Sequence, residues 1–388
     1  MYTLKHILTT FFTFLLLSFI ACTSDSDRRG NRRSGCDFKV TRTANLSYGS
    51  ESNQTFHFYA PNDANNKIGK KPLVILLHQG AFVMGSKDDA LITQISNNLA
   101  RCGVATAAID YRLLQPDNFK DGIIRTGIAV MDVFEGENSI KKELYNAIRD
   151  ARSAIRYFKI NAEQWGIDPD RIYIAGYSAG AIVALQSVFM DEEEAKNFYF
   201  GKTIVQNQGC LDCRGGNLDV NAAVRGVIAV NGALFDANFI TDADTTPVFI
   251  AYSENDNMIP TVSGRPFQKF MQATEIDLPS FQFEIGITGY DRLKEGKGRR
   301  SETQIDGLKP TLVIPANVPK LLIDAFTSDI FGSKYILSNA RQCKKESLLL
   351  PNIGHNFAVT GAGETTPQYY QLMERVIAFI HKDAAHKD

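Results

Sequence analysis

The sequence lacks an excess of charge of either sign: 42 Lys and Arg residues stand against 43 Asp and Glu residues, and the formal net charge is −1. Nucleic-acid-binding domains carry a basic patch or stripe, so this balance gives no indication of a nucleic-acid partner. No second Cys-x-x-Cys and no histidine pair follows Cys210 and Cys213 at the spacing of a zinc site. No fixed-period repeat is visible either. The sequence therefore predicts no repeat architecture, no bound metal and no cofactor.

The first 21 residues have the pattern of an export signal. Lys5 and His6 precede an apolar run over residues 7–21. At roughly 15 residues this run is shorter than the ~20 that a membrane-spanning helix needs. Ala21 lies directly before Cys22, which resembles a bacterial lipoprotein signal, in which Cys22 would be lipidated. We expect a cell-envelope lipoprotein, facing the periplasm or the cell surface and held to the membrane only through Cys22, with simple secretion as the alternative.

Two further segments follow the signal. Residues 22–36 are rich in Asp, Arg, Gly and Ser, which predicts a flexible tether, and residues 37–388 form the expected folded domain. Export implies an oxidising compartment. We therefore expect a structural disulfide that involves Cys210 and Cys213, with its partners undetermined. The remaining cysteines are Cys36, Cys102 and Cys343, so an odd thiol is left over.

The hydrophobic pattern of the domain predicts an α/β fold. Segments 37–48 and 51–59 alternate polar and apolar residues, as an antiparallel pair that opens a sheet does. The later apolar runs are continuous, as in strands buried on both faces, and cover 72–78, 104–110, 171–176, 224–230 and 247–252. Helical spacing occurs over 91–100, 144–158, 178–185 and 372–380. Strands that alternate with helices predict a mostly parallel, doubly wound sheet.

Two stretches interrupt this alternation, residues 117–137 and 261–330. The second is interpreted as an inserted segment of the same domain. Long loops in a compact domain tend to be lids or binding segments.

A candidate nucleophile lies where a predicted strand meets a predicted helix. Residues 176–180 read Gly-Tyr-Ser-Ala-Gly, with an apolar strand before them and a helical pattern after. A serine at such a turn has a strained backbone and an exposed hydroxyl, and the glycines avoid collisions with neighbouring backbone. The pattern predicts that Ser178 is the nucleophile of a serine hydrolase.

A serine hydroxyl needs a base, and the base needs an orienting carboxylate. In this type of fold the chain order is Ser, then Asp or Glu, then His. Position excludes five of the six histidines, namely His6 in the signal, His57 and His78 before the serine, and His381 and His386 at the end of the chain. His355 remains as the predicted base.

Asp256 is the predicted carboxylate, because it follows the apolar strand 247–252. Glu254 is its nearest rival, and Asp324 and Asp329 stay open if the inserted segment folds back.

Backbone N–H groups are expected to bind the oxyanion that forms during acyl transfer. Ala179 follows the nucleophile and supplies one of them. Gly80 and Ala81, after the strand 72–78, are small enough to let the backbone approach a substrate oxygen.

Several motifs in this order resemble the carboxylesterase and hormone-sensitive-lipase-like branch of the α/β-hydrolase family. They are residues 78–82 with 84–86, 109–113, Asp150 with 166–172, 331–334 and 354–357. The resemblance implies the α/β-hydrolase fold and an esterase activity. Two departures are Gln79, which replaces a glycine, and the wide gap between Asp256 and His355, which the insertion 261–330 explains.

The predicted reaction is hydrolysis of carboxylic esters through an acyl-enzyme, without metal or cofactor. The expected substrate is a small-molecule or polysaccharide ester, such as acyl groups on extracellular polysaccharide. Two alternatives stay open. One is a peptidase on the same fold. The other is a catalytically silent surface binding protein, an alternative that stays open because Gln79 replaces a glycine in the oxyanion segment.

Overall fold

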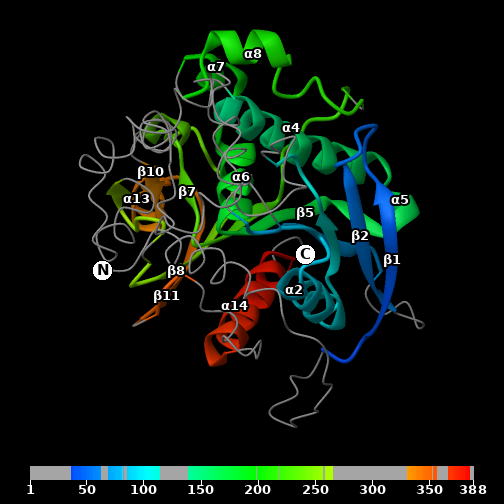
Figure 1. Cartoon of the computed structure of the whole chain (residues 1–388). Coiled ribbons are helices and arrows are strands. Elements are labelled where there is room, and N and C mark those ends of the chain that lie inside the picture. The colour runs from blue at the N-terminus through cyan, green and yellow to red at the C-terminus, as the bar shows by residue number, and fades with distance from the viewer. Residues whose placement is uncertain are drawn as a thin grey trace, which may run out of the picture.

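The computed structural model describes residues 36–62, 69–80, 82, 85–113, 139–197, 199–216, 218–256, 258–264, 330–351, 353–355 and 366–384. Within these residues the chain forms an eight-stranded sheet in the order β1-β2-β4-β3-β5-β6-β8-β11 (Figure 1). The β1–β2 and β2–β4 pairs are antiparallel, and every pair from β4 to β11 is parallel. The predicted signal, the lipidation site at Cys22 and most of the tether lie outside the described residues.

The strands of this sheet are β1 (Lys39–Ser47), β2 (Thr55–Asn62), β3 (Lys71–Leu77), β4 (Ala105–Ile109), β5 (Ile167–Tyr177), β6 (Gly226–Val230), β8 (Val248–Ser253) and β11 (Lys345–Leu350). The helices are α2 (Ala90–Arg101), α4 (Ser139–Ile160), α5 (Ala162–Trp165), α6 (Ala179–Phe189), α7 (Glu192–Asn197), α8 (Lys202–Gln208), η3 (Ala237–Phe239), α13 (Ser333–Asn339) and α14 (Pro367–Ala384). Every strand and helix predicted from the hydrophobic pattern is present, and the fold prediction is confirmed.

The continuous apolar runs fill two cores, one on each face of the sheet. In β3, Leu73, Ile75 and Leu77 belong to the core under α4 and α6, whereas Val74 and Leu76 belong to the core under α2 and α14. Alternate side chains of a strand point to opposite faces, so a strand covered on both faces has no polar side. Burial of such side chains contributes about 1.5–3 kcal/mol each.

A second, three-stranded sheet joins the two ends of the predicted insertion. It consists of β7 (Ala233–Leu234), β10 (Ile330–Gly332) and β9 (Ser263–Gly264), in that order. Ile330 is paired with Gly264, and the Gly332 amide donates to the Val262 carbonyl at 2.6 Å. The residues on either side of 265–329, which lie outside the described part, are therefore neighbours in one ladder.

Two disulfides form within the described chain, and one cysteine is left over, as the odd count required. Cys210 pairs with Cys213, which confirms the expected disulfide and supplies its partner. Cys36 pairs with Cys102, so the chain three residues before β1 is tied to the C-terminal end of α2. Cys343 is free and buried.

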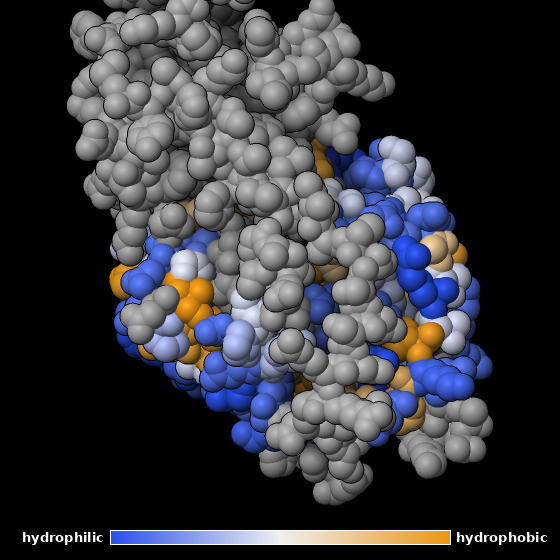
Figure 2. All heavy atoms as spheres, turned by 60° about the horizontal axis from the view of Figure 1, so that its bottom comes forward, coloured by the Kyte–Doolittle hydropathy of each residue, from blue (hydrophilic) through white to orange (hydrophobic). Residues whose placement is uncertain are grey.

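The described surface is mainly polar on the face that Figure 2 shows, with hydrophobic residues in small separate groups. The large hydrophobic side chains that are exposed in the described chain are Ile160, Leu218, Val262, Leu349 and Tyr370. Among the described helices, none combines the length and the apolar character that a bilayer crossing requires.

Candidate active site

The candidate nucleophile lies at a sharp turn between β5 and α6. Ser178 has a φ of 54° and a ψ of −120°, a conformation that costs a non-glycine residue about 1–3 kcal/mol. A Cβ on Gly176 would lie 2.2 Å from the carbonyl carbon of Gly180, and a Cβ on Gly180 would lie 2.4 Å from the Leu77 carbonyl oxygen. Gly176 is therefore required for the end of β5 to lie against the first turn of α6, and Gly180 for that turn to pack against the end of β3. Ser178 itself is half-buried.

Three side chains from distant parts of the chain meet at this turn. The Nε2 atom of His355 lies 2.8 Å from the Ser178 hydroxyl oxygen, and its Nδ1 atom lies 2.8 Å from Oδ2 of Asp256. An ionised carboxylate only accepts hydrogen bonds, so Nδ1 carries the proton and the Nε2 lone pair faces the serine. This is the arrangement that proton transfer from Ser178 to His355 requires.

The carboxylate is itself fixed by its own loop. Oδ1 of Asp256 accepts hydrogen bonds from the Met258 and Ile259 amides, each at 2.8 Å. Asp256 is 2% exposed, and such a buried charge is tolerated because both of its oxygens are hydrogen-bonded. The rival Glu254 is exposed, and Asp324 and Asp329 lie outside the described residues.

The segment that follows β3 lies beside the nucleophile turn. A Cβ on Gly180 would also meet the His78 carbonyl oxygen at 2.5 Å, so the end of β3 touches the first turn of α6. Gly80 is buried, with a φ of 131° that L-side chains rarely adopt. Ala179 is buried at the N-terminus of α6, and Ala81 lies outside the described residues.

The His78 side chain holds the next peptide of this segment. Its Nδ1 atom lies 2.8 Å from the carbonyl oxygen of Gln79, and burial lowers the pKa of His78 to about 4. The ring is therefore neutral at physiological pH, and its Nδ1–H donates to the Gln79 carbonyl. A Cβ on Gly85 would lie 2.1 Å from the same oxygen, so the segment folds back closely on itself.

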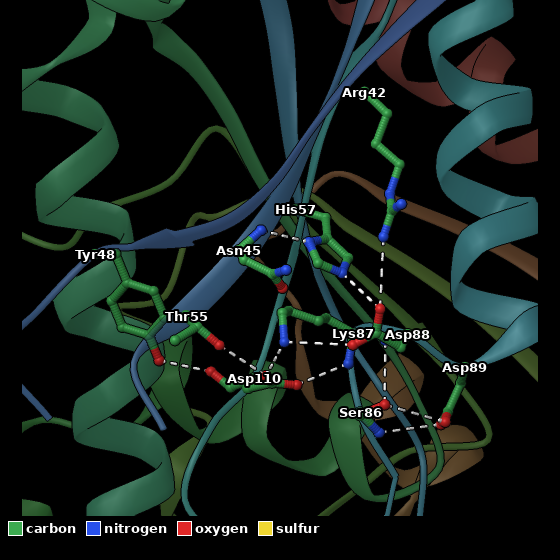
Figure 3. A network of polar contacts seen from close by, with 10 residues as sticks. All are labelled: Arg42, Asn45, Tyr48, Thr55, His57, Ser86, Lys87, Asp88, Asp89 and Asp110. Atoms are coloured by element: carbon green, nitrogen blue, oxygen red, sulfur yellow. Dashed lines mark hydrogen bonds and ion pairs between the residues drawn. The ribbon is translucent and has the colours of Figure 1, made fainter. Parts of the chain in front are cut away.

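A polar network, missed in the sequence, ties the far end of this segment to the sheet (Figure 3). Asp110, the first residue after β4, accepts hydrogen bonds from the Lys87 amide at 2.7 Å, from the Lys87 ammonium at 2.7 Å and from the Thr55 hydroxyl at 2.8 Å. Nε2 of His57 lies 2.7 Å from the Asp88 carboxylate, while the Asn45 amide donates to Nδ1 at 3.0 Å. Residues 86–89 are thus held against β1, β2 and β4.

One sequence signal could have pointed to Asp110. It is a charged residue at the carboxyl end of a parallel strand, the edge at which α/β proteins bind ligands. The motif at 109–113 was noted only as part of a family resemblance, and its contacts with Lys87 could not be derived.

Within the described residues, no group of three or more His, Cys, Asp or Glu side chains has the arrangement of a metal site.

Comparisons with known proteins relate this chain to esterases. Residues 120–224, which include Ser178 but neither Asp256 nor His355, match the BD-FAE family. A probable isoprenylcysteine alpha-carbonyl methylesterase of Oryza sativa subsp. japonica is 30% identical over 137 residues, 35% of this chain and 25% of that protein. Gut esterase 1 of Caenorhabditis elegans is 29% identical over 136 residues, 35% of this chain and 20% of that protein. The chain thus spans about a quarter of the length of the curated relatives that it matches.

The fold is shared with a solved structure, a truncated form of a carbohydrate esterase from gut microbiota. The TM-score is 0.50 and the sequence identity is 15%, with 91% of this chain and 99% of that chain covered. The relatives matched in sequence are esterases, and the whole domain has a fold that a carbohydrate esterase also has.

Proposed function

Since this chain is an α/β-hydrolase whose sequence similarity is to esterases of the carboxylesterase branch, we propose that it hydrolyses carboxylic esters through an acyl-enzyme on Ser178. The observation that carries the proposal is the chain of two hydrogen bonds from Ser178 through His355 to Asp256, each 2.8 Å long. A serine, a base and an orienting carboxylate in this order form the triad of serine hydrolases.

Acylation begins when His355 takes the hydroxyl proton on Nε2 and the Ser178 oxygen attacks the ester carbonyl carbon. The carbonyl π electrons move to the oxygen, which becomes the oxyanion of a tetrahedral intermediate. Asp256 accepts the Nδ1–H of the resulting imidazolium and stabilises its charge. Collapse of the intermediate breaks the bond to the alcohol oxygen, and His355 gives that oxygen its proton, so the alcohol leaves neutral.

Deacylation repeats these steps with water. His355 removes a proton from a water molecule, the hydroxide attacks the acyl carbon, and the returning proton releases Ser178 with a free carboxylic acid. No redox change occurs, and the balance of atoms is ester plus water giving acid plus alcohol.

The oxyanion would be held by the N–H groups of Ala179, Gly80 and Ala81. The Ala179 amide lies at the start of α6, where amide groups have no partner in the helix and the helix dipole favours negative charge. The contact of β3 with the first turn of α6 brings the segment with Gly80 to the same place. Loss of one such donor typically costs about 2.7–4 kcal/mol in the barrier.

The test of this function is Ser178→Ala, assayed with p-nitrophenyl acetate and with a fluorophosphonate probe. The wild-type chain should release p-nitrophenol and become labelled, and the variant should do neither. Ser338→Ala is the matched control, because Ser338 is on α13 and its hydroxyl donates to the Lys334 carbonyl oxygen. Turnover that survives in Ser178→Ala refutes the assignment.

The substrate that we favour is an acyl ester on an extracellular polysaccharide. This choice follows from the expected export of the chain, and the two disulfides support an oxidising compartment. The test measures acetate or ferulate release from acylated xylan. Turnover of an isoprenylcysteine methyl ester would instead favour the methyl ester that some relatives' names indicate. Turnover of an aminoacyl-p-nitroanilide would favour a peptidase.

Anchoring at Cys22 is a separate proposal that has its own measurement. Expression of the full chain with a labelled fatty acid should label the wild-type protein and leave Cys22→Ser unlabelled. Release of an unlabelled wild-type chain into the medium supports simple secretion instead.

A further inference from the structure

Two buried side chains converge on the carbonyl oxygen of His355. The Asn231 Nδ2 atom donates to this oxygen at 2.9 Å, and the Tyr177 hydroxyl donates to it as well. Asn231 is 1% exposed, Tyr177 6% and His355 4%. The backbone of the predicted base is thus held from two directions inside the protein.

Asn231 connects the histidine to β8, the strand that leads to the carboxylate. It directly follows β6, and its Oδ1 atom accepts the Ser253 amide at 2.8 Å while Nδ2 also reaches the Ser253 hydroxyl at 3.1 Å. Its own amide donates to the Ala251 carbonyl oxygen at 2.9 Å. Both donor and acceptor positions of the carboxamide are used, which a leucine of the same size could not do.

The backbone of Asn231 is in the left-handed region, with a φ of 50°. Asparagine is among the few non-glycine residues that adopt this conformation readily. The residue at this position therefore satisfies a backbone requirement and a side-chain requirement together.

Tyr177 connects the histidine to the nucleophile. It precedes Ser178 in β5, and its ring stacks with the His355 imidazole, with centroids 5.8 Å apart and planes inclined by 26°. The Tyr177 hydroxyl also donates a hydrogen bond to the backbone carbonyl oxygen of the same histidine. Ser178, Asp256 and His355 lie on three separate loops. Tyr177, which precedes Ser178, and Asn231, which is bonded to the end of β8, both donate to the His355 carbonyl oxygen. This oxygen therefore links the three loops.

We propose that Asn231 and Tyr177 are positioning residues for His355, an inference that rests on the proposed ester hydrolysis. The histidine makes its two side-chain bonds only if its ring sits between Ser178 and Asp256, and residues 353–355 belong to no helix or strand. Anchoring the carbonyl oxygen restricts the Cα position and hence the ring. A displacement of about 1 Å in such an arrangement can cost a factor of about 100 in rate.

The decisive variants are Tyr177→Phe and Asn231→Asp. The first keeps the ring stack and removes only the hydroxyl. The second keeps the size, the left-handed conformation and the acceptor for the Ser253 amide, and it removes the Nδ2 donor to His355 and to the Ser253 hydroxyl. We expect kcat for p-nitrophenyl acetate to fall about tenfold in each variant, as for the loss of the buried hydrogen bond to His355, with KM little changed. The double variant should lose less than the product of the two, because both residues act on one oxygen.

Tyr173→Phe is the matched control. Tyr173 is buried in the same strand, and its hydroxyl donates to the Ile380 carbonyl oxygen at 3.4 Å, far from Ser178 in the fold. Rates are normalised to the active sites that a fluorophosphonate titrates, so that a smaller folded fraction does not count as slower chemistry. The second-order rate of labelling gives an independent readout of serine activation.

A tenfold loss of kcat per titrated site in both variants, with the unfolding midpoint no lower than that of Tyr173→Phe, supports positioning. Wild-type rates per titrated site, even with a lower unfolding midpoint, overturn it and leave the two contacts a role in folding only. A wild-type protein that the probe does not label overturns the proposed ester hydrolysis, and positioning falls with it.

Discussion

The hydroxyl group of Tyr111 donates a hydrogen bond to the carbonyl oxygen of His78 at 2.8 Å, and the two rings stack with centroids 4.4 Å apart. His78 begins the segment that would supply oxyanion donors, and Tyr111 follows β4. The contact therefore fixes one end of that segment, while the Lys87–Asp110 contacts fix the other. Because burial raises the pKa of Tyr111, the hydroxyl remains a donor across the physiological range.

Tyr111→Phe should lower kcat/KM for p-nitrophenyl acetate by about three- to tenfold, because a net hydrogen bond of roughly 1 kcal/mol no longer restrains the segment. Tyr145→Phe is the control, since its hydroxyl donates to the Gly209 carbonyl oxygen at 3.2 Å. Equal stability losses in both variants with unchanged kcat/KM in Tyr111→Phe would mean that the contact serves the fold alone.

Lys87→Met should destabilise the protein by about 1–3 kcal/mol at pH 7, measured by urea unfolding, since it leaves the Asp110 carboxylate without its cation. Partial burial by itself lowers the pKa of Lys87, but the hydrogen bond to Asp110 outweighs it and the pKa is raised. A lysine whose pKa is raised in the folded protein contributes stability that is fully present below the pKa of the unfolded state. This stability is lost as pH rises through the pKa of the folded state. The difference between wild type and variant should therefore be constant from pH 7 to 9 and shrink above about pH 10.5.

Lys382→Met provides the comparison for this pair. Lys382 forms an ion pair with Glu346 at 3.2 Å, and its side chain is 62% exposed. Exposed pairs contribute about 0–1 kcal/mol, so this variant should unfold within that range of the wild type. Similar losses at both lysines would contradict the role given to the Lys87–Asp110 pair.

Asp89→Asn should stabilise the protein at pH 8. Burial raises the pKa of Asp89 to about 6, although hydrogen bonds from Ser86 oppose the shift. A raised carboxyl pKa means that ionisation is harder in the folded protein, so stability falls as pH rises from about 4 to about 6 and stays lower above. The variant should be more stable than wild type by on the order of 1–3 kcal/mol at pH 8 and equally stable near pH 4. A constant difference across this range would show that Asp89 does not titrate in it.

Removal of the two disulfides should have unequal effects. Cys36 and Cys102 are separated by 66 positions, and Cys210 and Cys213 by 3. The entropy of the unfolded loop makes the first bond worth about 4 kcal/mol and the second about 1–2 kcal/mol. Urea unfolding of Cys36→Ala/Cys102→Ala and Cys210→Ala/Cys213→Ala measures both, and a larger loss from the second pair would contradict the loop-entropy account.

The sequence predicted those features that depend on neighbouring residues. The continuous run in β3 has no polar side because Val74 and Ile75 fill different cores, and this is visible without coordinates. Ser178 was identified because the strand, the turn and the helix around it are contiguous. His355 followed from chain order and Asp256 from its place after the strand 247–252, and the structure brings both to Ser178.

The contacts that support these residues could not be predicted, because they join segments that are far apart in the sequence and no sequence motif links them. His57 and Asp88 lie 31 positions apart, and Asn231 and the His355 carbonyl 124. A backbone carbonyl has no sequence signature at all, so the Asn231 and Tyr177 bonds to it leave no motif. Disulfide pairing was equally open, since cysteine spacing does not determine connectivity.

Because β9 pairs with β10, the geometry of the triad does not depend on the length of the inserted segment. Asp256 comes before the segment and His355 after it, yet Gly264 and Ile330 are opposite each other in one ladder. Residues can be added or removed between these two positions without pulling the carboxylate away from the imidazole. The same chemical centre can therefore be combined with segments of different size, so selection for new substrates can act on one stretch of chain while the described sheet and its triad keep their structure.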